Sequence, residues 1–514
     1  MSRAERRCRA VSRAAHGFVA ACLAGAVPVA WAQSVRVTPT LDGQVLWTSN
    51  VGLQPGPAAE SDFVTTITPG FSIDYNGPRG FLRGNVSAPI TIYAKDQDRN
   101  QIVPVVDLAG RGEVVKDFFF VEAQASVSQT YFSPFGPRPA GLENVTDNRY
   151  TAQSYRVSPY IEGRPTGLIR YLVRDDNHWT RLSDTPVAAD DLYTNRFSAL
   201  IEREPTPFGW SSDFVRNEYW VGGTSTQRLM IARVRGTWRP DPQWQFFVSA
   251  GYEDNQFTLS ETKGETYGAG FSWRPTERMA LDASYEHRFF GASYNVQFSN
   301  RTPMTFWSVQ ASRNISSYPE QLASLPEGTF LPGVLNILLT NRIPDIDQRI
   351  AFIRQFLVER GLPVFLTGPL DLYNQQVYLL ELASATVGLI GVRNSVFVTA
   401  FRSRSEPLSG QGETLPPLLS AQNNNTQTGG GVTWAYQLSS VSTITASANY
   451  SHTTANPPFE ESTDATSVSL NWTRTISPRT NVHAGARWQR SNASRDVNDF
   501  SETAVFAGFR YRFW

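Results

Sequence analysis

Apolar and polar positions alternate along much of the chain with a period of two residues. In the segment 443–450, Ile444, Ala446, Ala448 and Tyr450 share one face, while threonine, serine and asparagine share the other. Segments 243–252, 281–288, 467–473 and 481–489 alternate in the same way. Each is about ten residues long, the length that a tilted membrane-spanning strand needs. This period predicts β-strands rather than helices.

The connections between these segments are of two lengths. Short turns marked by proline, glycine or small polar residues occur at 77–80, 164–167, 239–242, 274–277, 438–441 and 476–479, and longer polar stretches occupy 253–264, 407–427, 453–464 and 491–499. Short turns at one rim and long loops at the other are typical of outer-membrane barrels. Tryptophans close to the strand ends favour an interfacial aromatic girdle: Trp238, Trp244, Trp273, Trp434, Trp472 and Trp488.

The predicted fold is therefore all-β: a transmembrane antiparallel up-and-down β-barrel of the outer membrane, with roughly 18–22 strands and a helical insertion. No stretch after the N-terminal segment approaches the roughly 18 apolar residues of a membrane helix. Mean hydropathy, at −0.30, does not distinguish a barrel from a soluble protein, because only every second strand residue meets lipid.

The C-terminal segment 505–514 shows the same alternation. Its apolar positions, from Val505 to Phe513, alternate with Gly508, Arg510 and Arg512. The segment resembles the terminal strand that the barrel assembly machinery of bacteria reads. The predicted assembly signal comprises Phe509, Tyr511, Phe513 and Trp514, although Trp514 overhangs the alternation by one residue. The alternative is an ordinary edge strand of a soluble sheet.

The first 32 residues form a secretory signal peptide in this interpretation, and residues 33–514 form the barrel. Five arginines precede a small and apolar stretch, and Ala30-Trp31-Ala32 offers a small-x-small cleavage site. A lipoprotein signal ending at Cys22 is the alternative, but the apolar run before it is short. Both cysteines, Cys8 and Cys22, fall inside this segment, so the mature chain has no disulfide to rely on.

Net charge argues against a nucleic-acid partner. The whole chain has 46 basic and 46 acidic residues, and the predicted signal removes five arginines and one glutamate, which leaves a net charge of about −4. A mildly acidic chain without a basic stripe is a poor nucleic-acid binder.

Residues 314–376 interrupt the alternation and read as helical. Pro344 and Asp345 are typical of a helix start, and Arg360, Gly361 and Pro363 are typical of an end. The apolar face of this predicted plug helix comprises Ile346, Ile350, Ile353, Phe356 and Leu357; Leu331–Asn341 is a shorter candidate. Such helices either plug the lumen or cap the periplasmic mouth. If the flanking strands both run toward the short-turn side, the segment crosses back, either as one strand near Val364–Leu372 or by threading the lumen. With that crossing the strand count is about 22.

Charged and polar residues on the inward-facing positions of the predicted strands are candidates to line the lumen: Asp282, Glu286, Arg288, His483, Arg487, Arg510 and Arg512. Rings of charge set the permeation preference of a pore. Alternatively, these residues form salt-bridge ladders that fill an occluded barrel, and the two interpretations stay open.

Catalytic chemistry is weakly indicated, and we expect no enzyme. The mature chain has four scattered histidines, His178, His287, His452 and His483, without an assignable serine–acid partner. The acidic pairs Asp96/Asp98 and Asp175/Asp176 are expected in polar loops rather than in a calcium site. No catalytic residue, cofactor or metal ligand is predicted.

Several segments resemble one family across nearly the whole mature chain: 60–70, Ser317–Leu322, Arg342–Asp345, Gly361–Pro363, Gln375–Tyr378 and Phe401–Glu406. They are similar to the PEP-CTERM-system-associated outer-membrane β-barrel family. The resemblance implies a Gram-negative outer membrane and a role in exopolysaccharide production or exosortase-linked surface export. It supplies no catalytic residue.

The expected function is a gated or plugged conduit or scaffold in that setting. The alternatives are a general diffusion porin and a barrel enzyme acting on lipid or polysaccharide. Expected partners are outer-membrane lipid, the barrel assembly machinery, and exopolysaccharide or its export components. No nucleic acid is expected, and the oligomeric state stays open.

Overall fold

A computed structural model describes residues 35–183, 191–257, 261–317, 331–339, 342–360, 362–364, 366–370, 377–408 and 424–513. The predicted signal peptide and Trp514 lie outside the described residues. Within them, no helix combines the length and the apolar character that crossing a membrane would require.

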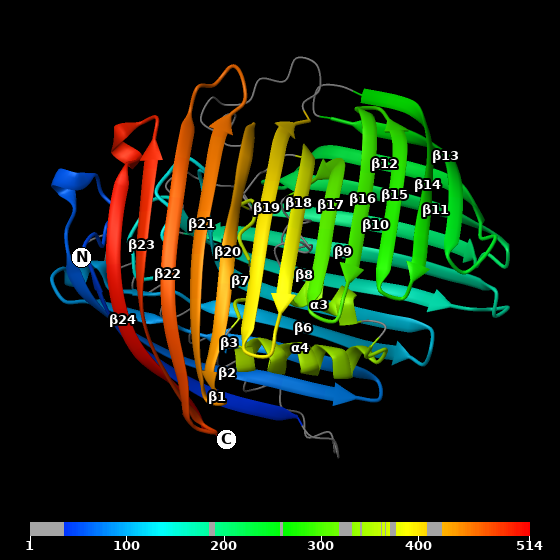
Figure 1. The fold of residues 1–514 in the computed structure, drawn as a ribbon. Helices are drawn as coiled ribbons and strands as arrows, with labels where there is room; N and C mark the ends of the chain where they lie inside the picture. Colours follow the sequence, from blue (N-terminus) through cyan, green and yellow to red (C-terminus); the bar gives the residue numbers. More distant parts are fainter. Residues whose placement is uncertain are drawn as a thin grey trace.

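The strands form one closed antiparallel sheet (Figure 1). Its wall consists of β1 (Arg36–Thr48), β2 (Asp62–Gly77), β3 (Gly80–Ser87), β6 (Val105–Val115), β7 (Phe119–Tyr131), β8 (Arg149–Gly163), β9 (Ile169–Ser183), β10 (Leu192–Arg203), β11 (Phe208–Val221), β12 (Thr224–Trp238), β13 (Trp244–Gln256), β14 (Glu261–Thr276), β15 (Met279–Arg288), β16 (Gly291–Arg301), β17 (Thr305–Ser316), β18 (Tyr378–Ile390), β19 (Asn394–Pro407), β20 (Asn425–Ser439), β21 (Ser442–Ala455), β22 (Ser462–Ser477), β23 (Thr480–Ala493) and β24 (Phe500–Arg512).

The wall closes where β1 pairs with β24, from Thr40 opposite Arg512 to Thr48 opposite Ala504. The barrel therefore has 22 strands, and the predicted fold class is confirmed. Two short strands, β4 (Ile90–Tyr93) and β5 (Gln101–Ile102), form a hairpin. β4 pairs with Val64–Ile67 near the start of β2, beyond the end of β3. Short 3-10 helices occupy Gly56–Ala58, Gln97–Arg99 and Asp496–Asn498.

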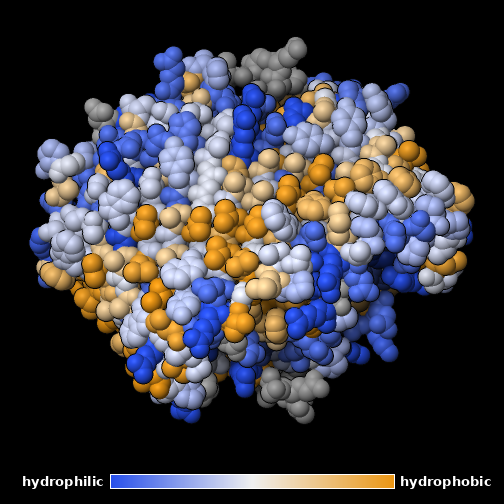
Figure 2. All heavy atoms as spheres, in the orientation of Figure 1, coloured by the Kyte–Doolittle hydropathy of each residue, from blue (hydrophilic) through white to orange (hydrophobic). Residues whose placement is uncertain are grey.

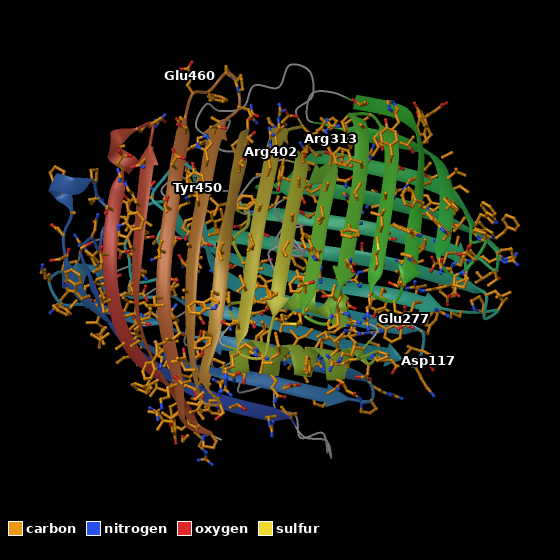
Figure 3. The ribbon with its side chains drawn as sticks, in the orientation of Figure 1. Asp117, Glu277, Arg313, Arg402, Tyr450 and Glu460 are labelled. Atoms are coloured by element: carbon orange, nitrogen blue, oxygen red, sulfur yellow. The ribbon has the colours of Figure 1, made fainter. Side chains whose placement is uncertain are left out.

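The two rims differ in the length of their connections. Short turns, such as those beside Asp117 and Glu277, form one rim, and longer loops, such as the one with Glu460, form the other (Figure 3). We call them the short-turn rim and the long-loop rim. Each strand has an outward and an inward face: on β24, Val505 is 53% exposed, whereas Glu502 and Ala504 on the other face are fully buried.

Apolar residues gather in a diagonal band across the outer wall (Figure 2). Stacked aromatic rings border this apolar belt at the short-turn rim, where Trp244 lies 5.5 Å from Phe246 and 5.4 Å from Trp273. A closed barrel leaves no unpaired strand edge, and an apolar belt with aromatic borders matches the hydrocarbon layer. The chain is an outer-membrane β-barrel.

One close approach of two strands depends on glycine. Gly84 of β3 has a φ of +154°, and a Cβ at this position would lie 2.0 Å from the carbonyl oxygen of Asp107 on β6. Any side chain at Gly84 would therefore separate β3 from β6.

The segment between β17 and β18 leaves and re-enters the wall at the same rim. Ser316, the last residue of β17, pairs with Tyr378, the first residue of β18. The two strands are therefore antiparallel neighbours, and the proposed crossing strand near Val364–Leu372 is wrong: the described residues of that stretch form no strand. The number of strands reaches 22 without it.

Candidate functional site: two segments inside the barrel

The segment between β17 and β18 carries two helices, α3 (Leu331–Leu339) and α4 (Ile346–Arg360). It is attached at the long-loop rim, yet its helices contact the wall near the short-turn rim. Leu331, Leu335, Ile353 and Leu357 form a buried cluster with wall residues that lie close to the short turns: Phe306, Phe397 and Ala435. The helices therefore lie inside the barrel, at the rim opposite their attachment (Figure 1).

Polar contacts hold the two helices together and tie them to both sides of the mouth. Arg349 is buried, and its guanidinium donates to Asn336 Oδ1 at 2.6 Å and to the Ile343 carbonyl at 2.8 Å. Arg360 donates to the Gly391 carbonyl, in the turn between β18 and β19, at 2.8 Å. On the other side, Arg354 Nη1 lies 3.8 Å from Asp74 Oδ2 of β2. The α4 helix thus reaches across the short-turn mouth.

The predicted plug-helix residues divide between the cluster and solvent. Ile353 and Leu357 are buried in the cluster, Phe356 packs against it, Ile350 is half-buried, and Ile346 is exposed. Sequence reasoning missed the buried Arg349, because an arginine between apolar positions reads as part of a solvated face. Its partners are backbone carbonyls and an asparagine of the same insertion, which no periodicity reveals.

The described residues between α4 and β18 contact the inner wall, and Val377 lies at the long-loop rim. The Thr367 hydroxyl contacts Asn449 of β21, and the Leu370 amide donates to Gln427 of β20 at 2.9 Å. Val377 is fully buried, and its amide donates to Gln227 of β12 at 3.2 Å. Val377 packs with wall and loop residues of the long-loop rim: Tyr219, Leu229, Phe257, Phe289, Ile315 and Leu408. Apolar contacts therefore narrow the opening of the barrel at the long-loop rim, as the helices do at the short-turn rim.

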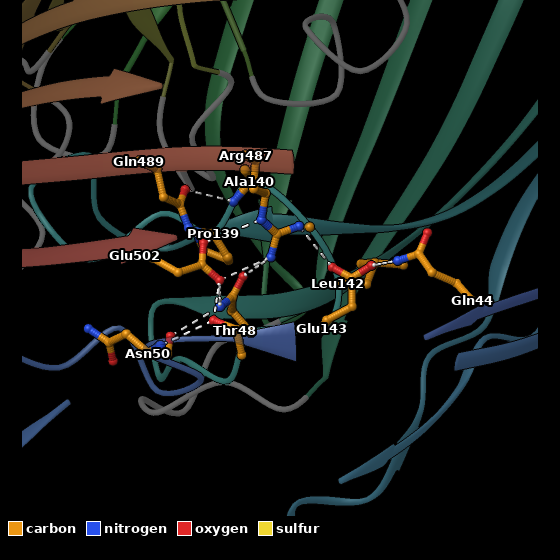
Figure 4. Close-up of polar contacts among 12 residues, drawn as sticks. Gln44, Thr48, Asn50, Pro139, Ala140, Leu142, Glu143, Arg487, Gln489 and Glu502 are labelled. Carbon is orange, nitrogen blue, oxygen red and sulfur yellow. Dashed lines mark hydrogen bonds and ion pairs between the residues drawn. The ribbon is translucent and has the colours of Figure 1, made fainter. Parts of the chain in front are cut away.

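A second segment, the loop 132–148 between β7 and β8, also folds inward (Figure 4). Arg487 of β23 lies 3.2 Å from Glu143 Oε2, 2.8 Å from Asn144 Oδ1 and 3.2 Å from Glu502 Oε1 of β24. We call these four residues the Arg487 latch. Glu502 is fully buried and the Arg487 side chain is 10% exposed, so the latch is shielded from water.

Further hydrogen-bond donors contact the two carboxylates of the latch. Glu502 accepts hydrogen bonds from Thr48 Oγ1 at 2.6 Å, Gln489 Nε2 at 2.6 Å and Asn144 Nδ2 at 2.8 Å. Gln44 Nε2 donates to Glu143 Oε1 at 2.8 Å. The buried Glu502 carboxylate thus accepts from three neutral donors in addition to the Arg487 guanidinium. The loop is therefore fastened to β1, β23 and β24, the strands at the seam where the barrel closes.

Two arginines shape the loop itself. Arg149 donates to the carbonyls of Gly141, Leu142 and Asn144 at 3.1, 3.2 and 3.0 Å. Arg138 reaches Ser451 of β21 at 3.5 Å. Burial lowers the pKa of Arg138 to about 10, so its guanidinium stays protonated at neutral pH.

The predicted lumen-lining residues fall into cross-strand pairs. Glu286 lies 3.1 Å from Arg233, Arg288 Nε lies 2.5 Å from the fully buried Glu253, and Asp282 lies 3.2 Å from Arg274. Arg510 lies 2.6 Å from Asp42, and His483 lies 3.3 Å from Gln44. Arg487 belongs to the latch, and Arg512 is exposed at the end of β24. Paired charges of this kind resemble a salt-bridge ladder more than a free ring of one sign.

The predicted assembly signal lies on the outer face of β24. Phe509 and Phe513 are exposed, and the rings of Tyr511 and Phe513 meet edge to face at 5.0 Å. Trp514 lies outside the described residues.

The four histidines stay apart. His178 Nε2 lies 2.5 Å from Ser154 Oγ in a buried pair, while the neighbouring Asp176 contacts Arg174 and Ser158. His452 contacts Asp464 at 2.8 Å, and His287 stacks on Tyr267. Among the residues that the structure describes, no group of three or more His, Cys, Asp or Glu side chains is placed to hold a metal ion.

No protein-family model and no curated protein sequence matches the chain. Solved structures do match it. The siderophore receptor PirA from Pseudomonas aeruginosa is 10% identical, with 94% of this chain and 82% of that chain covered and a TM-score of 0.45. The FrpB iron transporter from Neisseria meningitidis is 8% identical, with 93% and 82% covered and a TM-score of 0.47. OccK2 from Pseudomonas aeruginosa is 6% identical, with 93% and 98% covered and a TM-score of 0.36.

Proposed function

We propose that this chain is a gated conduit through the outer membrane, closed by the two segments inside its barrel. The observation that carries the proposal is the position of α3 and α4. They are attached at the long-loop rim and lie at the short-turn rim, where any solute that crosses the barrel must pass. The loop 132–148 narrows the path at the other end.

The contacts of α4 indicate how this gate opens. On one side α4 belongs to the buried apolar cluster, whose separation would expose a large apolar area. On the other side it touches β2 through Arg354 and Asp74, which are 59% and 50% exposed. Exposed ion pairs of this kind stabilise by about 0–1 kcal/mol. We therefore expect α4 to leave β2 first and to stay on the wall of β17–β20.

Removal of the insertion tests the proposal directly. Because Ser316 and Tyr378 already pair, a two-residue Asn-Gly turn can replace residues 317–377 without displacing either strand. In planar lipid bilayers, we expect rare, brief openings of the intact protein and a large, stable conductance of the shortened one. Equal currents would show that the insertion does not close the lumen. A stable open current through the intact protein would instead favour a diffusion porin.

A point substitution separates gating from pore size. Arg354→Ala removes only the weak contact with Asp74, so we expect more frequent openings of unchanged amplitude. Arg164→Ala is the matched control, because its 3.6 Å pair with Glu204 is equally exposed and lies at the same rim, between wall strands. The control should gate like the unsubstituted protein.

We further propose that the conduit carries an exopolysaccharide, or a protein exported with it, across the outer membrane of a Gram-negative bacterium. The support for this cargo is the sequence resemblance described above. Deletion of the gene should abolish surface polysaccharide, and the intact gene should restore it. A null strain with normal surface polysaccharide would exclude this cargo.

The proposal also treats the chain as a non-enzyme. Substitution of His178, His287, His452 and His483 by alanine, one at a time, should leave surface glycolipid and polysaccharide unchanged in structure. A modification that disappears with one of these histidines would support a barrel enzyme instead.

A further inference from the structure

The outer face of β9, β10 and β11 carries polar side chains inside the apolar belt. On β9, the aromatic residues Tyr171 and Trp179 face outward, and Asp175 lies midway between them on the same face. On β11, Arg216 lies between the outward-facing Trp210 and Trp220. With a rise of about 3.3 Å per residue and a tilt of about 40°, Asp175 is about 10 Å from either aromatic end. It therefore lies at the depth of the hydrocarbon.

The orientation of these side chains follows from their neighbours. Asn177 pairs with Val157, and Tyr171 pairs with Ile201; both aliphatic partners are exposed on the outer wall. The alternate residues face the lumen, where Asp176 contacts Ser158 and His178 contacts Ser154. Asp175 and Asn177 are therefore on the outward face.

We call Asp175, Asn177, Asn195, Arg216 and Glu218 the β9–β11 polar patch. Asp175 accepts a hydrogen bond from Asn195 Nδ2 and another from Asn177 Nδ2, both at 2.8 Å. Arg216 Nε lies 3.2 Å from Glu218 Oε1. The patch thus holds a carboxylate that accepts from two amides, beside a half-exposed guanidinium.

On the opposite wall, the described outward positions of β21 at the corresponding depth carry no charged side chain. On β21, eleven strands away around the barrel, Ala446 and Ala448 occupy the outward positions between Ile444 and Tyr450 (Figure 1). Charged side chains on the lipid face of a barrel are destabilising, most of all near the midplane. Retaining several at one place therefore favours a surface that protein covers rather than hydrocarbon.

We propose that the β9–β11 polar patch is an interface with a second copy of this chain. The patch is self-complementary, because the carboxylate of Asp175 on β9 and the guanidinium of Arg216 on β11 lie on opposite sides of β10. Asp175, Phe197 and Arg216 are consecutive partners in one register row across β9, β10 and β11. Asp175 and Arg216 are therefore two strands apart, roughly 10 Å between their Cα atoms.

A two-fold axis along the membrane normal, in front of β10, brings these groups together. Such a rotation keeps every residue at its depth and places β9 of one copy opposite β11 of the other. Because the strands tilt by about 40°, Asp175 and Arg216 differ in depth by about 6 Å, a distance that the long arginine side chain spans. Asp175 of each copy is then within reach of Arg216 of its partner, and the contact occurs twice. Phe197, which packs against Phe214 at 6.3 Å, lies at the centre of the interface.

Thiol cross-linking in native outer membranes tests the arrangement. The chain has only Cys8 and Cys22, both in the N-terminal segment, so the unsubstituted protein measures the background. Facing sheets lie about 10 Å apart, which a short bis-maleimide spans. Phe197→Cys should give a cross-linked dimer of this chain, and Ala448→Cys, outward-facing on the opposite wall, should give only background. Equal yields from the two variants, or capture of a different protein at Phe197→Cys, would overturn the proposal.

Charge exchange provides a second test that does not depend on cross-linker reach. Asp175→Arg or Arg216→Asp alone should weaken dimerisation by about tenfold or more, measured by native mass spectrometry of detergent-extracted protein. The double variant should regain it, because the two charges only exchange places across the axis. The proposal would also be contradicted if the unsubstituted protein, folded as a heat-modifiable barrel, were monomeric with or without bound lipid.

Discussion

At the scale of single residues, the Arg487 latch is a group of charged side chains buried inside the barrel. Arg487 and Glu502 lie 3.2 Å apart, and neither side chain is more than 10% exposed. Removal of one partner from a buried pair leaves the other charge without compensation, which costs far more than the pair itself contributes. Any displacement of the loop 132–148 that separates Glu143 and Asn144 from Arg487 therefore carries a large cost in free energy.

We expect Arg487→Ala to release that loop. The substitution leaves the buried Glu502 carboxylate without a cation, so the free energy that holds the loop inside should fall by about 3–5 kcal/mol. Limited proteolysis from the outside of intact cells should then cleave within 132–148, and bilayer conductance should rise.

The matched control is Arg510→Ala. Arg510 forms a 2.6 Å pair with Asp42, but its side chain is 56% exposed. Such a pair contributes about 0–1 kcal/mol, so proteolysis should not change. Cleavage at equal rates in both variants would indicate that the latch does not hold the loop.

Sequence patterns located Arg487 on an inward face but did not reveal the latch. The alternation on β23 assigns Arg487 to the polar side, which is a local property. Its partner Glu143 lies 344 residues away in the chain, in a loop with neither the two-residue nor the helical period. Side-chain partners at such separations depend on the closure of the whole barrel, and no pattern in a single sequence encodes them.

At the scale of elements, the α4 helix was predictable and its environment was not. Pro344, Asp345 and Arg360 mark ends that the structure places at Ile346 and Arg360. The sequence does not distinguish a location in the lumen from one at the periplasmic mouth, because local signals determine where a helix starts but not what it packs against. In the structure α4 lies inside the barrel and reaches across the short-turn mouth.

We expect Leu357→Ala to loosen the insertion while leaving the wall intact. Leu357 is buried in the cluster that joins α4 to β17, β19 and β20, and truncation of a buried leucine costs about 2–5 kcal/mol. Hydrogen exchange in α3 and α4 should accelerate, while the amides of the wall strands stay protected.

Phe352→Ala is the comparison for this experiment. Phe352 lies on the same helix but is 40% exposed, so its truncation should accelerate exchange much less. Faster exchange in β17–β20 after Leu357→Ala would show instead that the helices and wall unfold together.

At the scale of the whole molecule, the alternation in the sequence was enough to predict a closed barrel. An inward and an outward face along each strand can both be satisfied only if the sheet has a polar interior and an apolar exterior. A crossing strand would be needed only if β17 and β18 ran in the same direction, and they are antiparallel neighbours. Strand direction depends on pairing, which the alternation does not contain.

We expect Phe513→Asp to reduce the amount of assembled barrel. Phe513 lies at the exposed aromatic end of β24, beside the seam with β1, where its amide donates to Pro39. A charge at this border disfavours insertion, so heat-modifiable barrel in the outer membrane should fall and unfolded chain should accumulate in the periplasm. Phe63→Asp, at the other rim on β2, the strand next to β1, provides a control for any added charge. Equal losses of assembled barrel in the two variants would argue against a terminal signal.

The way the insertion is built also constrains the order of biogenesis. Its buried cluster combines Phe306, which precedes the insertion in the chain, with Phe397 and Ala435, which follow it. The insertion is attached at the long-loop rim, so once the wall of 22 strands has closed it can reach the short-turn rim only by passing along the lumen, past the inward-folded loop 132–148. We therefore expect the helices to dock while β1 and β24 are still apart, so that the late strands fold around a core already in place. The gate would then be a template in the nascent protein before it is a gate in the mature one.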